Sequence, residues 1–307
     1  MRIAAIDLGS NSVILLIATR DADGHIVPLY QESQITRIGY RVNETGRIQE
    51  SSAVATLGVL KHYFEVTQKH GADHLIITAT SAMRDAANST TFLDRVEKAI
   101  GVRPHIISGE TEASYVMKAV RHDFAELSGT VLIFDIGGGS TELIRYRGDS
   151  IESLRSINIG AVRLTEKFLH NDPMTDTERS IARQAIWDTL PELHFSDRFS
   201  AVGVGGTITT LQAVNKKVPK YNSTVIHKST LQRTEICDVL RLFRALPLAE
   251  RKKLPGLPPK RADIIPMGTL IVLTILEKYG ISQLYVSDRG LRWGMVYEMF
   301  DKQSDGS

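Results

Sequence analysis

The stretch "VLIFDIGGGSTE" (131–142) places an aspartate, three consecutive glycines and the polar triplet Ser-Thr-Glu directly after a run of apolar residues. The same plan occurs earlier in the chain, in "IAAIDLGSNSVILLI" (3–17). Three pairs of residues correspond: Asp7 with Asp135, Gly9 with Gly137, and Ser12 with Ser140. Because an internal repeat constrains architecture more than any single propensity does, we predict two duplicated domains.

Each half begins with three strands joined by short turns and continues with mixed helices and strands. Strands are expected at 2–7, 12–19, 25–31, 73–80, 103–107, 130–135, 140–147, 150–157 and 283–287, and a strand, glycine turn and helix within 199–211. Helices are expected at 51–70, 90–100, 109–121, 160–169, 175–193, 230–244, 261–279 and 290–300. The helix at 175 opens with the capping-box spacing Thr175-x-x-Glu178. The predicted class is α/β, with domains at 1–123 and 124–307, a hinge near 121–129, a cleft between the domains, and a final helix that packs back on the first.

The composition of the chain gives no sign of several classes of partner and indicates a cellular compartment. The chain has 307 residues, 42% of them hydrophobic and 23% charged, with a net charge of +2, so nothing global indicates a nucleic-acid or membrane partner. The single cysteine, Cys237, excludes an internal disulfide and is typical of a reducing compartment. The longest apolar run (264–276) is shorter than the roughly 20 residues of a membrane span, and Asp7 and Asn11 interrupt any signal-like segment. We expect a cytoplasmic protein.

The glycine turns indicate phosphate binding. Glycines at 137–139 can adopt positive φ, which would let consecutive backbone N–H groups converge on an anion, and the turn at 9–12 would do the same from the other domain. The aspartates before the turns, Asp7 and Asp135, would repel phosphate unless a divalent cation lay between, so Mg²⁺ is implied. The chain has no Walker P-loop motif, and Gly203-x-Gly205-Gly206 lacks the third glycine of a dinucleotide fingerprint.

Eight blocks, in order, resemble the exopolyphosphatase/guanosine-pentaphosphate phosphohydrolase (Ppx/GppA) family of the superfamily that includes actin, the sugar kinases and acetate kinase. The blocks are "DLGSNS" (7–12), "TATSAMRDAAN" (78–88), "ISGETEA" (107–113), "DIGGGSTEL" (135–143), "NIGAVRLTE" (158–166), "GVGGT" (203–207), "RADIIPMG" (261–268) and "SDRGLRWG" (287–294). The resemblance implies two actin-like (ribonuclease H-like) domains. It also implies the release of orthophosphate, processively from inorganic polyphosphate or from the 5′ end of guanosine pentaphosphate.

The resemblance further implies roles for single residues. Glu112 would be the general base that activates water, while Arg84 and Arg37 would contact phosphate. Asp135 and Glu142 would organise Mg²⁺, with Mn²⁺ as an alternative and a monovalent cation such as K⁺ as a further candidate. Asp7 would position the metal or water, or else only stabilise its turn. The two turns would hold phosphate oxygens through Gly9, Ser10, Asn11, Ser12, Gly137, Gly138, Gly139 and Ser140.

Alternatives remain open at this point. Glu110 and Glu112, two positions apart, point to different faces of the expected helix, and the family pattern selects Glu112. A phosphotransferase of the same superfamily, or a non-catalytic sensor of polyphosphate or guanosine tetraphosphate, would share the fold.

Two groups of basic residues are either solvated faces or a track for a polyanion. In superfamily relatives the turn at 203–206 lies near the nucleoside, so the first group could serve polyphosphate or a guanosine polyphosphate. The groups are Lys216, Lys217, Lys220, Lys228 and Arg233, and Arg251, Lys252, Lys253, Lys260 and Arg261. Apolar helices near the C-terminus suggest a homodimer.

Overall fold

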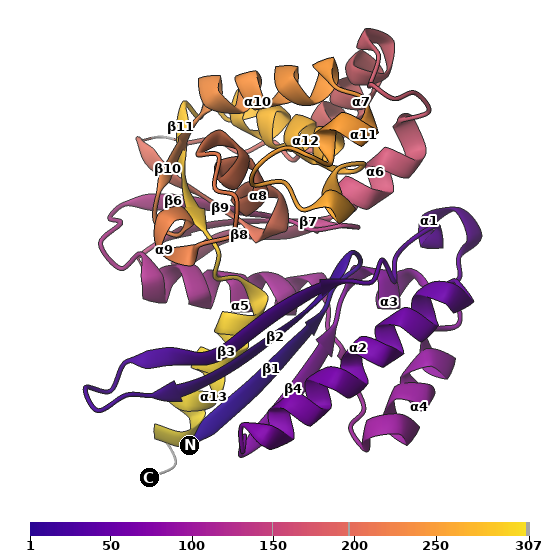
Figure 1. Cartoon of the computed structure of the whole chain (residues 1–307). Helices are drawn as coiled ribbons and strands as arrows, with labels where there is room; N and C mark the ends of the chain where they lie inside the picture. The colour runs from indigo at the N-terminus through magenta and orange to yellow at the C-terminus, as the bar shows by residue number, and fades with distance from the viewer. Residues whose placement is uncertain (149, 196, 305–307) are drawn as a thin grey trace. The chain divides into compact units, whose positions relative to one another are not determined.

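The computed structural model describes residues 1–148, 150–195 and 197–304 (Figure 1). They form two compact units, one made of Met1–Ala119 and the segment that starts at Gly290, the other of Val120–Arg289. The last helix, α13 (Leu291–Ser304), therefore belongs to the first unit although it follows the second in the sequence. The predicted end of the second domain, at 307, lies outside the described residues.

The first unit is built on a five-stranded sheet in the order β3-β2-β1-β4-β5. β1 is antiparallel to β2 and parallel to β4, and β4 is parallel to β5. The strands are β1 (Arg2–Leu8), β2 (Ser12–Arg20), β3 (Ile26–Ile35), β4 (His74–Ala79) and β5 (His105–Ile106). The helices are α1 (Val42–Thr45), α2 (Glu50–Lys69), α3 (Ser81–Asp85), α4 (Ser89–Ile100), the greater part of α5 (Gly109–Asp123) and α13.

Both faces of β1 are buried, which explains its nearly continuous apolar sequence. On one face, Ile6 packs in a core with Leu60 and Tyr63 of α2. α13 also packs against β1 and β2, and its Met295 sulfur accepts a hydrogen bond of 3.3 Å from the Thr78 hydroxyl of β4. These contacts with α2 and α13 fix the position of the sheet, whose strand ends carry the first glycine turn.

The second unit repeats this plan on a six-stranded sheet in the order β10-β11-β9-β6-β7-β8. β6 is antiparallel to β7 and parallel to β9, as β1 is to β2 and β4. The strands are β6 (Thr130–Ile136), β7 (Thr141–Arg147), β8 (Ser150–Ile157), β9 (Phe199–Val204), β10 (Thr230–Gln232) and β11 (Gln283–Ser287). The helices are α6 (Ala161–Phe168), α7 (Asp176–Thr189), α8 (Gly205–Asn215), α9 (Ser223–Ile226), α10 (Arg233–Ala245), α11 (Leu248–Arg251) and α12 (Ile265–Lys278).

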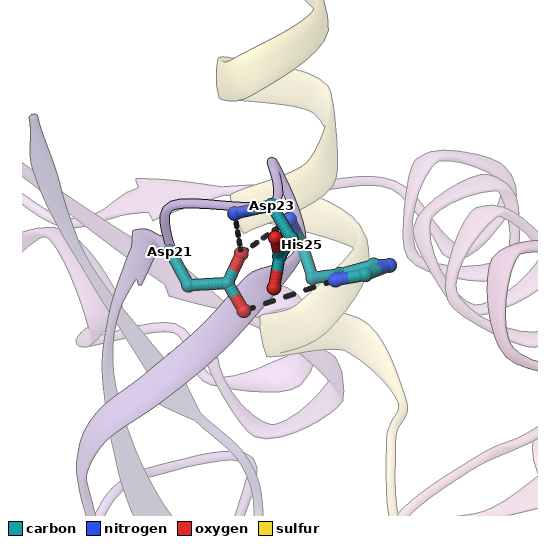
Figure 2. A group of neighbouring side chains, drawn as sticks. All are labelled: Asp21, Asp23 and His25. Atoms are coloured by element: carbon teal, nitrogen blue, oxygen red, sulfur yellow. Dashed lines mark hydrogen bonds and ion pairs between the residues drawn. The ribbon is translucent and has the colours of Figure 1, made fainter.

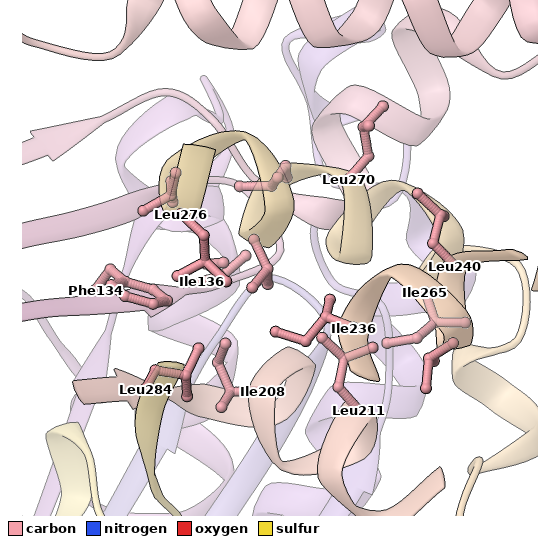
Figure 3. Close-up of a cluster of buried hydrophobic side chains, with 14 of the residues drawn as sticks. Phe134, Ile136, Ile208, Leu211, Ile236, Leu240, Ile265, Leu270, Leu276 and Leu284 are labelled. Carbon is pink, nitrogen blue, oxygen red and sulfur yellow. The ribbon is translucent and has the colours of Figure 1, made fainter. Parts of the chain in front are cut away.

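The predicted α/β duplication is confirmed, and each unit has the strand connectivity of an actin-like domain. In Figure 3, Phe134 and Ile136 of β6 meet side chains of α8, α10 and α12 in one apolar cluster. Since strand side chains alternate between faces, Asp135 projects from the opposite face of the sheet. The apolar run at 264–276 forms the buried α12, as expected, and no helix of the described residues is long and apolar enough to cross a membrane.

The predicted capping box at the start of α7 is confirmed. One oxygen of Glu178 accepts hydrogen bonds from Thr175, and the other from the backbone N–H groups of His170 and Asn171. Burial raises the pKa of Glu178, but these hydrogen bonds outweigh it and lower the pKa to about 2. The carboxylate therefore ties the loop before α7 to the helix.

We expect Glu178→Gln to lower the free energy of unfolding by about 1–2 kcal/mol at neutral pH. A carboxyl group whose pKa is lowered by folding stabilises the protein above its unfolded-state pKa, and this contribution is lost as the pH falls through the folded value. The difference between wild type and variant should thus be full at pH 7 and shrink toward pH 2. Urea unfolding across this range measures it, and a pH-independent difference would contradict the role given to Glu178.

Some elements differ from expectation. The helix expected at 230–244 is the short strand β10 followed by α10, and the helix expected at 261–279 starts only at Ile265. The strand expected at 103–107 shrinks to His105–Ile106. The short helices α1, α3, α9 and α11 were not predicted, because four or five residues give no helical periodicity.

Candidate functional site

The predicted site residues fall into two groups, one in each unit. The first unit holds the turn at 9–12 with Asp7, Arg37, Arg84 and Glu112, and the second holds the turn at 137–140 with Asp135 and Glu142.

The two glycine turns have the same internal hydrogen bond. The N–H of Gly9 donates to the carbonyl of Ser12 at 3.1 Å, and the N–H of Gly137 donates to the carbonyl of Ser140 at 3.0 Å. Asp7 and Asp135 occupy equivalent places, the penultimate residue of a strand with an antiparallel and a parallel neighbour in one register. The duplication therefore extends to the detail of each turn.

In the first turn, the backbone carbonyls are engaged by the protein. The carbonyl of Asn11 accepts from the N–H groups of Thr36 and Arg37 at 3.1 and 3.0 Å, and that of Ser10 accepts from Gly39 at 2.8 Å. The side-chain amide of Asn11 is buried and has no hydrogen-bond partner among the described residues. An unsatisfied buried amide is costly and calls for a specific explanation, and a bound polar ligand is one.

The second turn is held by the N-terminus of α6. The carbonyls of Gly137 and Gly138 accept from the first N–H groups of α6, and that of Gly139 accepts from the Nε of Arg163 at 2.7 Å. With these carbonyls occupied, the N–H groups of Gly138 and Gly139 donate to no acceptor within the described chain. Such paired N–H groups suit an anion.

The glycines of the second turn do not have the backbone conformation that was predicted for them. Among the described residues, the glycines with positive φ do not include Gly137, Gly138 or Gly139. Two close approaches of backbone are found here instead: a Cβ at Gly137 would lie 3.2 Å from the carbonyl oxygen of Ser140, and a Cβ at Gly160, before α6, would lie 2.3 Å from the carbonyl oxygen of Gly138. The turn is shaped by its contact with α6 and not by left-handed backbone.

The two predicted catalytic residues, Glu112 and Arg84, are hydrogen-bonded to each other. Arg84 follows β4 in α3, and Glu112 lies in the first turn of α5, just after β5. Nη1 of Arg84 donates to Oε2 of Glu112 and to the carbonyl of Ile107, both at 2.9 Å. The side chain of Arg84 is only 23% exposed and that of Glu112 only 13%. β4 and β5 are parallel neighbours, so the residues that follow them meet at one edge of the sheet.

This environment changes the acidity of Glu112. Burial raises the pKa of the Glu112 carboxyl, and the charge and hydrogen bond of Arg84 offset only part of that rise. A carboxylate with a raised pKa is a stronger base, and its protonation lies closer to neutral pH. Nη2 and Nε of Arg84 have no acceptor among the described residues, so they remain available to a ligand.

Asp135 and Glu142 meet across the β6–β7 ladder. They are directly opposed in the antiparallel register, so their side chains share one face of the sheet. Glu142 is almost fully buried, and its Oε1 accepts a 2.7 Å hydrogen bond from the Ser156 hydroxyl of β8. Two carboxylates fixed side by side are the hard oxygen donors that Mg²⁺ prefers, so these residues fit the predicted ion.

Three further residues bear on this half-site. Ser156 and Gly205 were not predicted as site residues, and Arg261 was predicted only as part of a basic group. Ser156 carries no sequence signal. Gly205, with φ of +90°, sits against Asp135: a Cβ there would lie 2.3 Å from Oδ1 of Asp135. The guanidinium of Arg261 packs on Gly206 at the start of α8. Burial lowers the pKa of Arg261 to about 10, and no acceptor for its guanidinium occurs among the described residues. The "GVGGT" and "RADIIPMG" blocks contain the last two of these residues.

A different trio of potential metal ligands lies in the first unit. Asp21, Asp23 and His25 gather on the β2–β3 turn, as Figure 2 shows, and all three are exposed. Oδ1 of Asp21 accepts from the N–H groups of Asp23 and His25 at 3.0 and 2.8 Å. These bonds shape the hairpin turn, which accounts for Asp21 without a metal.

Comparisons with known proteins agree with the architecture. A family model described as the Ppx/GppA phosphatase family matches residues 16–303. A protein of Mycobacterium tuberculosis named exopolyphosphatase 2 is 32% identical over 97% of this chain and 98% of that protein. A bifunctional 3-dehydroquinate synthase/phosphatase of Fusobacterium nucleatum is 35% identical over 96% of this chain, which spans 46% of that protein.

A third relative and one solved structure add to this. A guanosine-5′-triphosphate,3′-diphosphate pyrophosphatase of Vibrio atlanticus is 28% identical over 97% of this chain and 59% of that protein. The crystal structure of the Aquifex aeolicus member of the Ppx/GppA family superposes with a TM-score of 0.81 at 34% identity, covering 99% of this chain and 98% of that one.

Proposed function

The chain belongs to the Ppx/GppA phosphatase family, and from this premise we propose that it hydrolyses terminal phosphoanhydride bonds. The substrates are inorganic polyphosphate, from which orthophosphate is released processively, and guanosine pentaphosphate, which loses its 5′-terminal phosphate. The relatives named exopolyphosphatase and guanosine-5′-triphosphate,3′-diphosphate pyrophosphatase support this substrate class. The observation that carries the proposal is the buried Glu112 carboxylate held by Arg84.

The proposed reaction needs positioning and charge neutralisation more than covalent help. Glu112 accepts a proton from water, whose oxygen attacks the terminal phosphorus in line with the bridging oxygen. The new P–O bond yields orthophosphate, and the broken bond leaves its electron pair on the bridging oxygen of the shortened chain. Arg84 holds the Glu112 carboxylate at the angle for proton transfer and directs its remaining N–H groups at the phosphoryl oxygens.

The glycine turns bind the substrate in this proposal. The N–H groups at 10–11 and 138–139 donate to phosphate oxygens, with Ser12, Ser140 and Arg37 as further donors. Asp135 and Glu142 would hold Mg²⁺, or Mn²⁺ in its place, and Asp7 would position the metal or the attacking water. When bound, the cation neutralises charge on the transferred phosphoryl group. Arg261 adds a positive charge next to Gly206. No carboxylate among the described residues pairs with this guanidinium.

The proposal also covers the cellular compartment, further ligands and the oligomeric state. The single cysteine favours the cytoplasm. We also predict that the protein requires a monovalent cation such as K⁺ and binds guanosine tetraphosphate. The homodimer also stays a prediction, although the apolar residues of α12 that suggested it are buried inside the second unit.

A phosphate-release assay with Mg²⁺ tests the proposal, using long-chain polyphosphate and guanosine pentaphosphate side by side. Release from either substrate supports it, and the ratio of kcat/KM values gives the preference. Tight binding without release would replace it with the sensor, and transfer of phosphate to an acceptor other than water would replace it with a phosphotransferase.

The pH dependence follows from the surroundings of Glu112. The base must be ionised to accept a proton, so a raised pKa moves the acidic limb of kcat/KM above the ordinary carboxyl value of 4.5. Because Arg84 lowers this pKa, Arg84→Gln should move the limb further toward neutral pH as well as reduce the rate. Initial rates from pH 4 to 9 measure both shifts. If the acidic limb of the Arg84→Gln profile lay at or below its wild-type pH, Glu112 would not be the base whose pKa Arg84 lowers.

A further inference from the structure

A pocket of about 280 Å³ opens in the first unit between the loop after β3 and the first turn of α2. Its lining residues are Thr36, Arg37, Tyr40, Ser51 and Ser52. Four of the five carry a hydroxyl group, the fifth a guanidinium, and none is acidic. The volume lies below the roughly 300–1,000 Å³ of sites for drug-sized ligands, so the pocket suits a small anionic group.

The first turn of α2 contributes a positive end to this pocket. The helix runs over Glu50–Lys69, and its N-cap, Gln49, makes no side-chain hydrogen bond to the free N–H groups. Such an end attracts anions through these N–H groups and the helix dipole. Glu50, the acid of this turn, is bound by Arg95 through two hydrogen bonds of 2.9 Å.

A second, independent feature also indicates a ligand. Thr36 is 91% buried, with a relative exposure of 9%, and its hydroxyl oxygen has no hydrogen-bond partner in the part of the chain that the structure describes. The next residue, Arg37, has a φ of 55°, a left-handed conformation that is uncommon for a residue with a side chain. Buried unpaired groups and backbone strain cluster at binding sites, and an oxyanion would satisfy the Thr36 hydroxyl.

The pocket is continuous with the first glycine turn. The N–H groups of Thr36 and Arg37 both donate to the Asn11 carbonyl, and Gly39 donates to that of Ser10. Ser10 in turn accepts a 3.2 Å hydrogen bond from the N–H of Ala82 in α3, the helix that carries Arg84. Within this unit, one hydrogen-bonded frame thus joins the pocket to the residues placed around the reacting phosphate.

We propose that this pocket, the α2 pocket, is a second phosphoryl-binding subsite, which takes a phosphoryl group other than the one that is hydrolysed. Its identity as a substrate subsite rests on the proposed function. The chemistry is that of a small oxyanion bound by hydroxyls, a guanidinium and a helix N-terminus. Two sources share that chemistry, a phosphoryl group along a polyphosphate chain and free inorganic phosphate.

The test adds one negative charge to the pocket. Ser51→Asp places a carboxylate among the lining residues, and the fold should tolerate it because Ser51 is exposed and acids stabilise the first turn of a helix. Val54→Asp is the matched control: it puts the same charge on the same helix at a residue that is 55% exposed and does not line the pocket. Both are made in the full chain carrying Glu112→Gln, which prevents turnover.

Calorimetric titration with inorganic phosphate and with tripolyphosphate, at one salt concentration, separates the outcomes. We expect Ser51→Asp to weaken tripolyphosphate binding about tenfold through charge repulsion, and Val54→Asp to leave it within about twofold. Weaker binding of tripolyphosphate alone assigns the pocket to the substrate chain, and an equal loss for both probes assigns it to free phosphate. Equal affinities of the two Asp variants for both probes would overturn the proposal.

Failure of the α2 pocket is distinguishable from failure of the proposed function. If the wild type releases phosphate and the two Asp variants bind alike, only the pocket is wrong. If the wild type releases none but Ser51→Asp still loses affinity, the pocket stands as an oxyanion site without the hydrolase. Thermal denaturation of each variant checks that the first unit remains folded.

Discussion

Glu112→Gln should reduce kcat for phosphate release by about 10²-fold or more, while polyphosphate binds with nearly the affinity of wild type. The glutamine keeps the size of the side chain and can still accept the hydrogen bond from Arg84, which in wild type is 2.9 Å long. It has no basic oxygen that could take a proton from water. Phosphate release and calorimetric binding, measured on the same preparation, give the two quantities.

Glu110→Gln is the matched control for this experiment. Glu110 lies two residues earlier in the same first turn of α5 and is exposed, whereas Glu112 is 13% exposed. We expect its kcat to stay within a factor of about two of wild type, because the changed side chain is exposed and such substitutions alter stability little. If Glu112→Gln kept most of the wild-type rate, or if Glu110→Gln lost as much, another group would have to be the base.

The duplicated frame could be predicted because its signals are local. The apolar runs before Asp7 and Asp135 are long enough to mark buried strands, and the glycines that follow end them. The structure places both aspartates in the same register relative to their neighbours, as the repeat requires. In contrast, β10 is only Thr230–Gln232, and its pairing with β11 makes it a strand, so the residues alone favoured a helix.

The physical basis of the site was less predictable than its residues. Arg84 and Glu112 are 28 positions apart, and only the parallel pairing of β4 with β5 brings them together. The glycines of the second turn were expected to supply positive φ, yet none of them has it, and the tightest approach is that of Gly160, before α6, to the backbone of Gly138. Contacts between segments decide such points, and a single sequence does not contain them.

Gly205 illustrates this. The motif "GVGGT" is weak evidence in the sequence, but in the fold Gly205 leaves room for the side chain of Asp135. Gly205 has a φ of +90°, and a methyl group on it would lie 2.3 Å from Oδ1 of Asp135. The side chain of Asp135 is the flexible partner in this clash, so its carboxylate would swing away from its position opposite Glu142. Gly205→Ala should therefore damage the predicted Mg²⁺ site while most of the fold survives.

We expect Gly205→Ala to raise the Mg²⁺ concentration for half-maximal phosphate release about 10- to 100-fold, a range typical of disturbed ligand support. Asp135→Asn should have an effect of similar direction without the backbone strain. Gly280→Ala is the control, since Gly280 has a φ of +68° and a methyl group on it would meet no atom within 4 Å. It should lose about 1 kcal/mol of stability with an unchanged Mg²⁺ requirement. Mg²⁺ titrations of activity, and of thermal stability without substrate, measure these effects. If neither Gly205→Ala nor Asp135→Asn changed the Mg²⁺ requirement, the prediction that Asp135 and Glu142 bind the cation would be wrong.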